Sequence, residues 1–193
     1  LAGMLSRVEG MSRAALAEGF NFGGGGFRDF WKRLEGRIAV NVGGYVGHCA
    51  VRRYVMGDAA SERTATPEEI AAMQELVRAA MREGAIGFST SQLDLHVGED
   101  GRGVPSNFAA PEEILALASV LAEFPWGAVE IIPRSHSEGH DEADRKLLLE
   151  LARVSGKAVE IGLLTPTPES PMGWERTLDF VREARAQGLR IHP

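Results

Sequence analysis

Apolar residues recur at helical spacing in several stretches of the chain, and each stretch is followed by a short apolar run. The clearest example begins at Thr66, where a capping residue is followed by proline at the first helical position, and Glu69 completes a capping box. Apolar positions then continue to Met81, and Gly84 is placed to end the helix. The pattern predicts a helix over residues 66–83 and a short strand over residues 85–88.

This helix-then-strand unit repeats along the chain. We expect further helices over residues 27–34, 111–124, 141–155 and 172–187, and further strands over residues 38–42, 127–132, 158–164 and 189–191. Strands joined by helical crossovers run parallel. The sequence therefore predicts an α/β fold with about five parallel strands, either an open doubly wound sheet or a partial (β/α)8 TIM barrel. The end of the chain inside the fifth expected strand favours the partial barrel.

Composition narrows the possible partners. The chain has 193 residues, of which 44% are hydrophobic and 25% charged, as in ordinary globular domains. Its net charge of -6 disfavours nucleic acid, and no apolar run approaches the roughly 18 residues that a membrane span needs. Residues 1–10 lack the pattern of a signal peptide, and the single cysteine, Cys49, excludes an internal disulfide. We therefore expect a cytoplasmic protein whose partner is a small molecule.

Candidate substrate-binding residues lie where parallel α/β folds bind ligands, at the carboxyl ends of the strands. Ser89 and Ser91 close the strand expected at residues 85–88, and their hydroxyls can bind a carboxylate or carbonyl, or cap the next turn. His96 lies in the long loop 92–109, a length that is often functional. Arg134 follows the next strand, and its planar guanidinium suits a carboxylate, with a surface salt bridge as the alternative. We expect Asn41 and Thr165 at the same edge.

The histidines do not form a recognisable metal motif. They all follow predicted strands, but there is no His-x-His on a strand and no His-Glu-x-x-His on a helix, so exposed loop histidines are the simpler interpretation. They are His48, His96, His136, His140 and His192.

Three other features are open to more than one interpretation. Glu130 and Glu160 lie in matching Ala-Val-Glu-Ile segments, as an acid/base or metal pair or as carboxylates bonded to Arg or Lys. Cys49 is expected to be a small buried residue rather than a nucleophile paired with His48. The four glycines at 23–26 favour a flexible loop over a phosphate cradle, because no strand precedes them and no Lys-Ser/Thr follows.

Several segments resemble the N-acyl-D-amino-acid deacylases (D-aminoacylases), a branch of the amidohydrolase superfamily. Residues 41–48 and 52–57 are similar to that family's V-G-H and R-x-x-V-M-G elements, and residues 65–70 and 84–91 to the helix and strand that follow. The similarity is strong from Ile38 to Leu121, after which only the helix–strand rhythm fits. The resemblance implies a TIM barrel that hydrolyses a non-peptide C–N bond: zinc-bound water attacks the amide carbonyl and an aspartate moves the proton.

The resemblance also implies which part of the barrel this is. Residues 1–193 would form a single piece covering roughly strands three to seven, and most of the family's metal ligands would lie outside it. Two ligand histidines of the family are expected inside it, but their positions are occupied by Ile132 and Leu163, which cannot bind zinc. The leading hypothesis is a metal-dependent amidohydrolase; the alternatives are a small-molecule-binding pseudoenzyme that has lost the metal site, or a nucleotide-binding domain, for which no phosphate loop is present.

Overall fold

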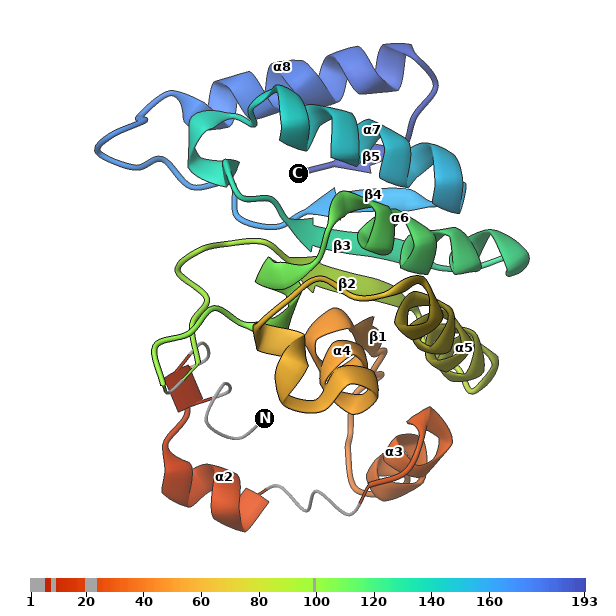
Figure 1. Ribbon diagram of the computed structural model, residues 1–193. Helices are drawn as coiled ribbons and strands as arrows, with labels where there is room; N and C mark the ends of the chain where they lie inside the picture. Colours follow the sequence, from red (N-terminus) through yellow and green to blue (C-terminus); the bar gives the residue numbers. More distant parts are fainter. Residues whose placement is uncertain (1–5, 8–9, 20–23, 99) are drawn as a thin grey trace.

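The five strands form one parallel sheet in sequential order. The computed structural model describes residues 6–7, 10–19, 24–98 and 100–193, so parts of the N-terminal segment and one glycine of the 23–26 run lie outside the described residues. Within it the sheet order is β1-β2-β3-β4-β5, and every pairing is parallel (Figure 1). The strands are β1 (Tyr45–Gly47), β2 (Gly87–Ser91), β3 (Ala128–Ile132), β4 (Ala158–Ile161) and β5 (Ile191–His192). The predicted α/β class and strand number are confirmed.

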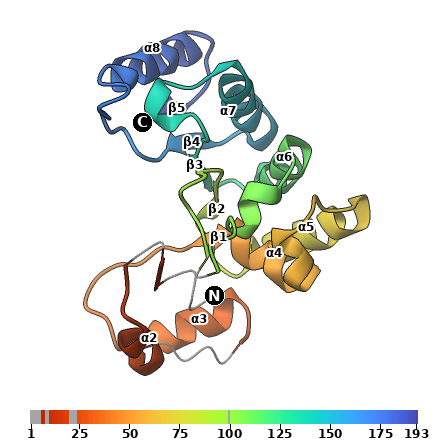
Figure 2. The ribbon, with the colours of Figure 1, turned by 60° about the vertical axis from the view of Figure 1, so that its left-hand side comes forward.

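Helices connect the strands and lie along one side of the sheet (Figure 2). They are α4 (His48–Met56), α5 (Pro67–Arg82), α6 (Pro111–Ser119), α7 (Glu142–Ser155) and α8 (Gly173–Ala186), preceded by α2 (Arg13–Gly19) and α3 (Phe27–Leu34). The other face of β2, β3 and β4 carries no helix among the described residues. A parallel sheet with helices on its outer side is the arrangement of a segment of a (β/α)8 barrel. No helix in the described part of the chain is long and apolar enough to cross a membrane.

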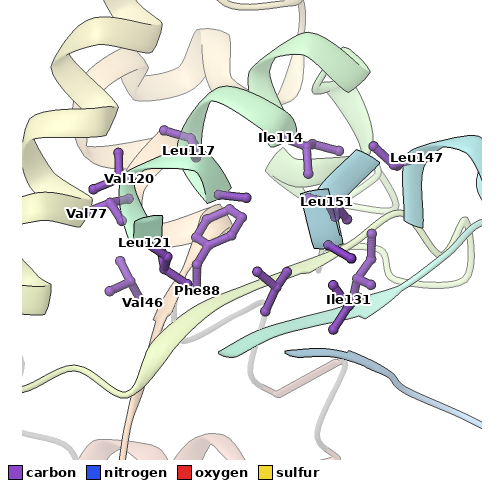
Figure 3. Packing of buried hydrophobic residues seen from close by; sticks show 14 of the residues in the cluster. Val46, Val77, Phe88, Ile114, Leu117, Val120, Leu121, Ile131, Leu147 and Leu151 are labelled. Atoms are coloured by element: carbon purple, nitrogen blue, oxygen red, sulfur yellow. The ribbon is translucent and has the colours of Figure 1, made fainter. Parts of the chain in front are cut away.

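The hydrophobic core lies between the sheet and these helices. Alternate strand residues such as Phe88 and Ile131 point toward the helices and are completely buried. Figure 3 shows Phe88 beside Leu117 and Leu121, and Ile131 beside Leu151. Because strand side chains alternate between faces, the intervening residues must point to the uncovered face.

The helix ends largely follow the predicted capping signals. Before α5, the backbone N–H of Glu69 donates to Thr66 Oγ1 at 3.3 Å and the N–H of Thr66 donates to Glu69 Oε2 at 2.8 Å, so the predicted capping box is confirmed. Asp141 is the N-cap of α7 rather than part of its first turn: its carboxylate accepts from the backbone N–H of Asp144 at 2.8 Å. The helix predicted over residues 111–124 is α6 to Ser119, continued by a 3-10 turn over Val120–Glu123.

The first strand was predicted in the wrong place. Residues 38–42 form no strand, and the side chains of Ile38, Val40 and Val42 are 44%, 70% and 47% exposed. Their alternating pattern fits a strand, but no strand or helix among the described residues pairs with it. The first strand is instead β1, three residues further on. Asn41 therefore precedes β1 and lies toward its amino end, contrary to our expectation.

Two other strands end at residues that differ from the predicted ones. β2 continues through Ser91, so Ser89 lies within the strand, two residues before its end. β4 stops at Ile161, and Leu163 has a positive φ of 66°, which ends the extended conformation expected to run to residue 164. The helix α4 was not predicted, because its N-cap is Gly47 and no side chain caps it.

Candidate functional site

A row of polar residues crosses the uncovered face of the sheet, which we call the open face. The strand register aligns four of these polar residues, Ser89, Glu130, Glu160 and His192, on the successive strands β2 to β5, with Gly47 beside Ser89 on β1. Ser89 and Glu130 are half-buried, whereas Glu160 and His192 are exposed. In a complete barrel this face points to the interior, below the carboxyl ends of the strands.

A hydrogen bond across the open face indicates that the sheet is curved. The hydroxyl of Tyr45 on β1 donates to Glu160 Oε2 on β4 at 3.2 Å, passing over β2 and β3. In a flat sheet three strand spacings would separate these backbones by roughly 14 Å. The residues that neighbour Tyr45 in register are Gly87, Ala128 and Ala158, whose small side chains leave room for a crossing side chain. The open face is therefore concave, as in a barrel.

The two carboxylates on this face influence each other. Burial raises the pKa of Glu130 above its usual value, and the negative charge of Glu160 raises it further. Burial and the neighbouring Glu160 raise the pKa of Tyr45 to about 12. Within the described residues neither glutamate forms an ion pair with Arg or Lys, so the interpretation as structural ion pairs is not supported. A carboxyl group that retains its proton more readily can exchange it with a bound molecule.

The predicted residues at the end of β2 are brought together. Ser91 Oγ lies 2.8 Å from His96 Nδ1, and the backbone N–H of Leu93 donates to the same hydroxyl at 3.3 Å. Ser91 thus both caps its turn and contacts His96. Ser106 also donates to the backbone oxygen of Ser91, so the long loop folds back onto the strand end.

Arg134 lies apart from these residues. Its Nε is 3.4 Å from Asp94 Oδ1, and both side chains are more than half exposed. It lines a cavity of about 620 Å³ between the amino ends of α6 and α7, on the helix side of the sheet. Ser89, Ser91 and His96 do not line this cavity. The four predicted substrate-binding residues are therefore divided between the open face and the cavity.

His48 directly follows the carboxyl end of β1, but it belongs to a buried network and is not the exposed loop histidine that we expected. Its Nδ1 is 2.8 Å from Thr90 Oγ1 and its Nε2 is 2.8 Å from Glu113 Oε1, and Arg52 donates to the other Glu113 oxygen. Burial lowers the pKa of His48. Burial opposes ionisation of Glu113, but the hydrogen bonds from His48 and Arg52 outweigh it and lower its pKa. The network joins β2, α4 and α6.

His140 is also not the exposed loop histidine that we expected. Its side chain is 5% exposed and its backbone φ is 66°. Thr177 Oγ1 lies 3.4 Å from its Nε2, while its Nδ1 and that of His136 have no hydrogen-bond partner in the described part of the chain. Burial lowers the pKa of His140 to about 4. Cys49 is half-buried against Ser106 at 3.2 Å, not beside His48 as a reactive pair.

The described residues of this chain do not form a metal site. No group of three or more His, Cys, Asp or Glu side chains among them could hold a metal ion. Ile132 ends β3 and Leu163 follows β4, so the two apolar residues at the expected ligand positions do lie at the carboxyl edge. The donor set of the residues that the structure describes therefore does not fit zinc.

Sequence reasoning missed Tyr45, which lies on the open face, and Gln92 and Asn107, which line the cavity. Gln92 could have been noted because it directly follows the strand that ends at Ser91. Tyr45 was missed because the first strand was misplaced. No local signal marks Asn107.

A curved parallel sheet with outer helices and polar groups along its inner face is a segment of a barrel of the kind used by many enzymes. The sequence model of the amidohydrolase family matches residues 3–185. The chain belongs to the amidohydrolase family.

The chain is similar to D-aminoacylases and to an N-acyl-D-glutamate deacylase. A D-aminoacylase from Alcaligenes xylosoxydans xylosoxydans is 48% identical over 65 residues, which are 33% of this chain and 13% of that protein. A D-aminoacylase structure with a binuclear metal centre superposes with a TM-score of 0.70 and 28% identity, covering 86% of this chain and 32% of the other. The structure of N-acyl-D-glutamate deacylase from Bordetella bronchiseptica, complexed with zinc and a phosphonate inhibitor, superposes with a TM-score of 0.69 and 26% identity. The match covers 86% of this chain and 33% of the other. The chain thus spans about a third or less of these relatives.

Proposed function

We propose that the protein containing this chain is a metal-dependent amidohydrolase that cleaves a non-peptide C–N bond, as N-acyl-D-amino-acid deacylases do. The observation that carries the proposal is the family match over residues 3–185. The similarity to a zinc-containing deacylase supports zinc as the metal. We propose that the five strands are roughly barrel strands three to seven and that the metal ligands lie mostly outside this chain. The free Cys49 is consistent with action in the cytoplasm on a small-molecule amide.

In this proposal the open face and the carboxyl edge orient the substrate. Ser89 projects from the open face, and the Ser91 hydroxyl and His96 imidazole meet at the end of β2. These groups can donate to a substrate carbonyl or carboxylate. Arg134, half-exposed beyond β3, offers a guanidinium to a substrate carboxylate that extends over the edge. Glu130 is placed to hold a proton on the open face.

The test uses the protein expressed from its complete reading frame, assayed with N-acetyl-D-amino acids before and after zinc is removed and restored. We expect amine release that depends on zinc. Ser91→Ala should raise KM about five-fold, because one hydrogen bond to the substrate is worth about 1 kcal/mol. Ser119→Ala is the matched control, because Ser119 bonds only its own helix at Ala116 and should leave KM unchanged.

A second candidate is a binding protein without catalysis. The observation that favours it is the pair of apolar residues, Ile132 and Leu163, at the carboxyl edge. It predicts that N-acyl amino acids raise the melting temperature of the complete protein while no amine is released and no metal is retained. Zinc-dependent turnover would reject it.

A further inference from the structure

The loop that joins β3 to α7, residues 133–141, is fastened to the first turns of α8 (Figure 1). It starts at the carboxyl end of β3 and therefore belongs to the carboxyl edge of the sheet. Arg176 on α8 donates to the backbone oxygen of Glu138 in the loop at 2.7 Å. Gly173 lies so close to the loop that an added Cβ would be 1.9 Å from the backbone oxygen of Ser137. The position of the loop thus depends on α8.

His140 is the side chain through which this loop reaches the interior of the protein. It is 5% exposed, and its ring lies against Phe180 of α8 with 6.1 Å between the ring centroids. Thr177 Oγ1 lies 3.4 Å from His140 Nε2 and donates its own proton to the backbone oxygen of Gly173 at 3.3 Å. The hydroxyl therefore accepts from the imidazole, which places the proton of the neutral ring on Nε2.

A second proton on this ring has no acceptor. The other nitrogen, His140 Nδ1, is buried with no hydrogen-bond partner in the described part of the chain. Protonation there would put both a positive charge and an unsatisfied N–H group inside the protein, and each of these is costly. The contact between the loop and α8 therefore tolerates only the neutral imidazole.

The charged groups around the ring do not compensate for its burial. Two acidic and two basic side chains face it from α7 and from the loop: Asp144, Asp141, Arg145 and His136. The α8 side chains that contact the ring, Thr177 and Phe180, are uncharged. The carboxylate of Asp144 is held by Ser135, whose backbone N–H donates to it at 2.7 Å and whose hydroxyl donates to it as well. Burial is the largest effect, and it lowers the pKa of His140 to about 4.

The backbone of His140 is also held in an unfavourable conformation. Its φ is 66°, in the left-handed region that residues with a Cβ seldom adopt. Arg145 stabilises this conformation, because its Nε donates to the backbone oxygen of His140 at 3.0 Å and its Nη2 to that of Gly139 at 3.2 Å. The same guanidinium lies 5.4 Å from the centre of the Phe180 ring. Strained residues persist only where their neighbours hold them, so the loop can relax once the His140 ring leaves its site.

We propose that this loop is an acid-released latch, which is closed on α8 while His140 is neutral and opens, with the rest of the fold intact, once His140 binds a proton. Arg134 lies in the same loop, so opening changes its position at the carboxyl edge. The latch thus couples acidity to the binding of a ligand at that edge. The proposal rests on the loop and its neighbours in α7 and α8, and it stands whether or not the protein hydrolyses amides.

The two states of the ring determine the size of the effect. The pKa of His140 is about 4 in the closed latch and returns to 6.5, the ordinary value of histidine, in the open latch. Between these values only the open form binds the proton, so a falling pH favours opening. The ratio of open to closed molecules should therefore rise about 30-fold between pH 7.5 and pH 5.

Amide hydrogen exchange of the complete protein, corrected for the intrinsic effect of pH on exchange, measures this ratio. We expect the hydrogen-bonded amides of residues 135–141 to lose protection about 30-fold between pH 7.5 and pH 5. Low concentrations of urea separate local opening from global unfolding, because opening one loop exposes little surface. Exchange in the loop should not respond to urea, whereas exchange in α5 should accelerate. Loop exchange that is independent of pH, or as sensitive to urea as exchange in α5, would overturn the proposal.

Three variants identify the groups responsible, and circular dichroism at both pH values checks that each is folded. His140→Asn removes the titrating ring but keeps a residue type that tolerates the positive φ, and it should abolish the rise in opening. His192→Asn, the same change at an exposed histidine, should retain the rise. Arg176→Met removes the bond to Glu138 and should increase opening about five-fold at both pH values, with the pH-dependent rise unchanged. A full rise in His140→Asn, or loss of the rise in Arg176→Met, would show that His140 is not the switch.

Discussion

Individual side chains in this chain are placed by partners far away in sequence, which limits what sequence patterns reveal about them. Glu113 looks like an ordinary acidic residue in the first turn of a helix, next to the similar Glu112. The structure buries Glu113 against His48 and Arg52, whose positions are 65 and 61 residues away. The role of His48 could not be predicted, because only the fold brings these residues together. By contrast, Ser91 and His96 are only 5 residues apart, so their contact could be anticipated from the sequence.

The buried network makes a direct prediction for stability. Glu113→Gln removes the charge that pairs with the fully buried Arg52 and should lower the free energy of unfolding by about 3–5 kcal/mol. Urea denaturation monitored by circular dichroism measures the change. Glu112→Gln is the control, since Glu112 is exposed, and it should stay within about 0.5 kcal/mol of the parent. Equal effects at both positions would mean that the network contributes little.

His140 predicts how stability depends on pH. Its pKa is about 4 in the folded protein against 6.5 for the free side chain, because burial and the nearby Arg145 outweigh the attraction of Asp144. Between these values the unfolded chain binds the proton and the folded chain does not, so stability falls as pH decreases. The titration of His140 should lower the free energy of unfolding by about 2 kcal/mol between pH 7.5 and pH 5.

His140→Asn removes this titration while keeping a residue type that tolerates the positive φ. The unfolding free energies at pH 7.5 and pH 5 should differ less in this variant than in the parent protein. Part of the pH dependence remains, because the pKa of His48 is also lowered. The exposed His192→Asn serves as the control. An unchanged pH dependence in His140→Asn would contradict the assignment.

At the scale of elements, helices with side-chain caps were predicted well and short strands were not. The capping box at Thr66 and the cap at Asp141 are local, so sequence alone placed α5 and α7 closely. β1 has only 3 residues, and its position depends on pairing with β2. The apolar alternation in residues 38–42 satisfied the strand pattern without a partner to pair with, which local periodicity cannot detect.

Gly87 lies where the backbones of β2 and β3 approach each other closely. Its φ is 152°, and an added Cβ would lie 1.9 Å from the backbone oxygen of Ala128. Gly87→Ala should therefore cost at least about 2 kcal/mol, because the strands must separate or the backbone must change. Gly47→Ala on β1 meets nothing within 4 Å and should cost less than about 1 kcal/mol. Thermal unfolding of both variants provides the comparison.

At the scale of the whole molecule, the sheet has two open edges. β1 and β5 are the first and last strands of the order, so one side of each has no partner strand in the described part of the chain. Unpaired parallel edges favour association with other chains. The 193-residue chain in isolation should therefore self-associate with rising concentration, measured by light scattering. A stable monomer at high concentration would show that the edges are protected.

The hydrogen bond between Tyr45 and Glu160 has a consequence for the order of folding. It joins residues 115 positions apart, and it forms only when β1 and β4 are both in place with the strands between them. Contacts of such high sequence separation close the largest loops and slow the folding rate. The environment of the Tyr45 ring should thus be among the last to become native during refolding, later than helices whose caps form within a few residues. Its ultraviolet absorbance would report completion of the assembled sheet rather than the first collapse of the chain.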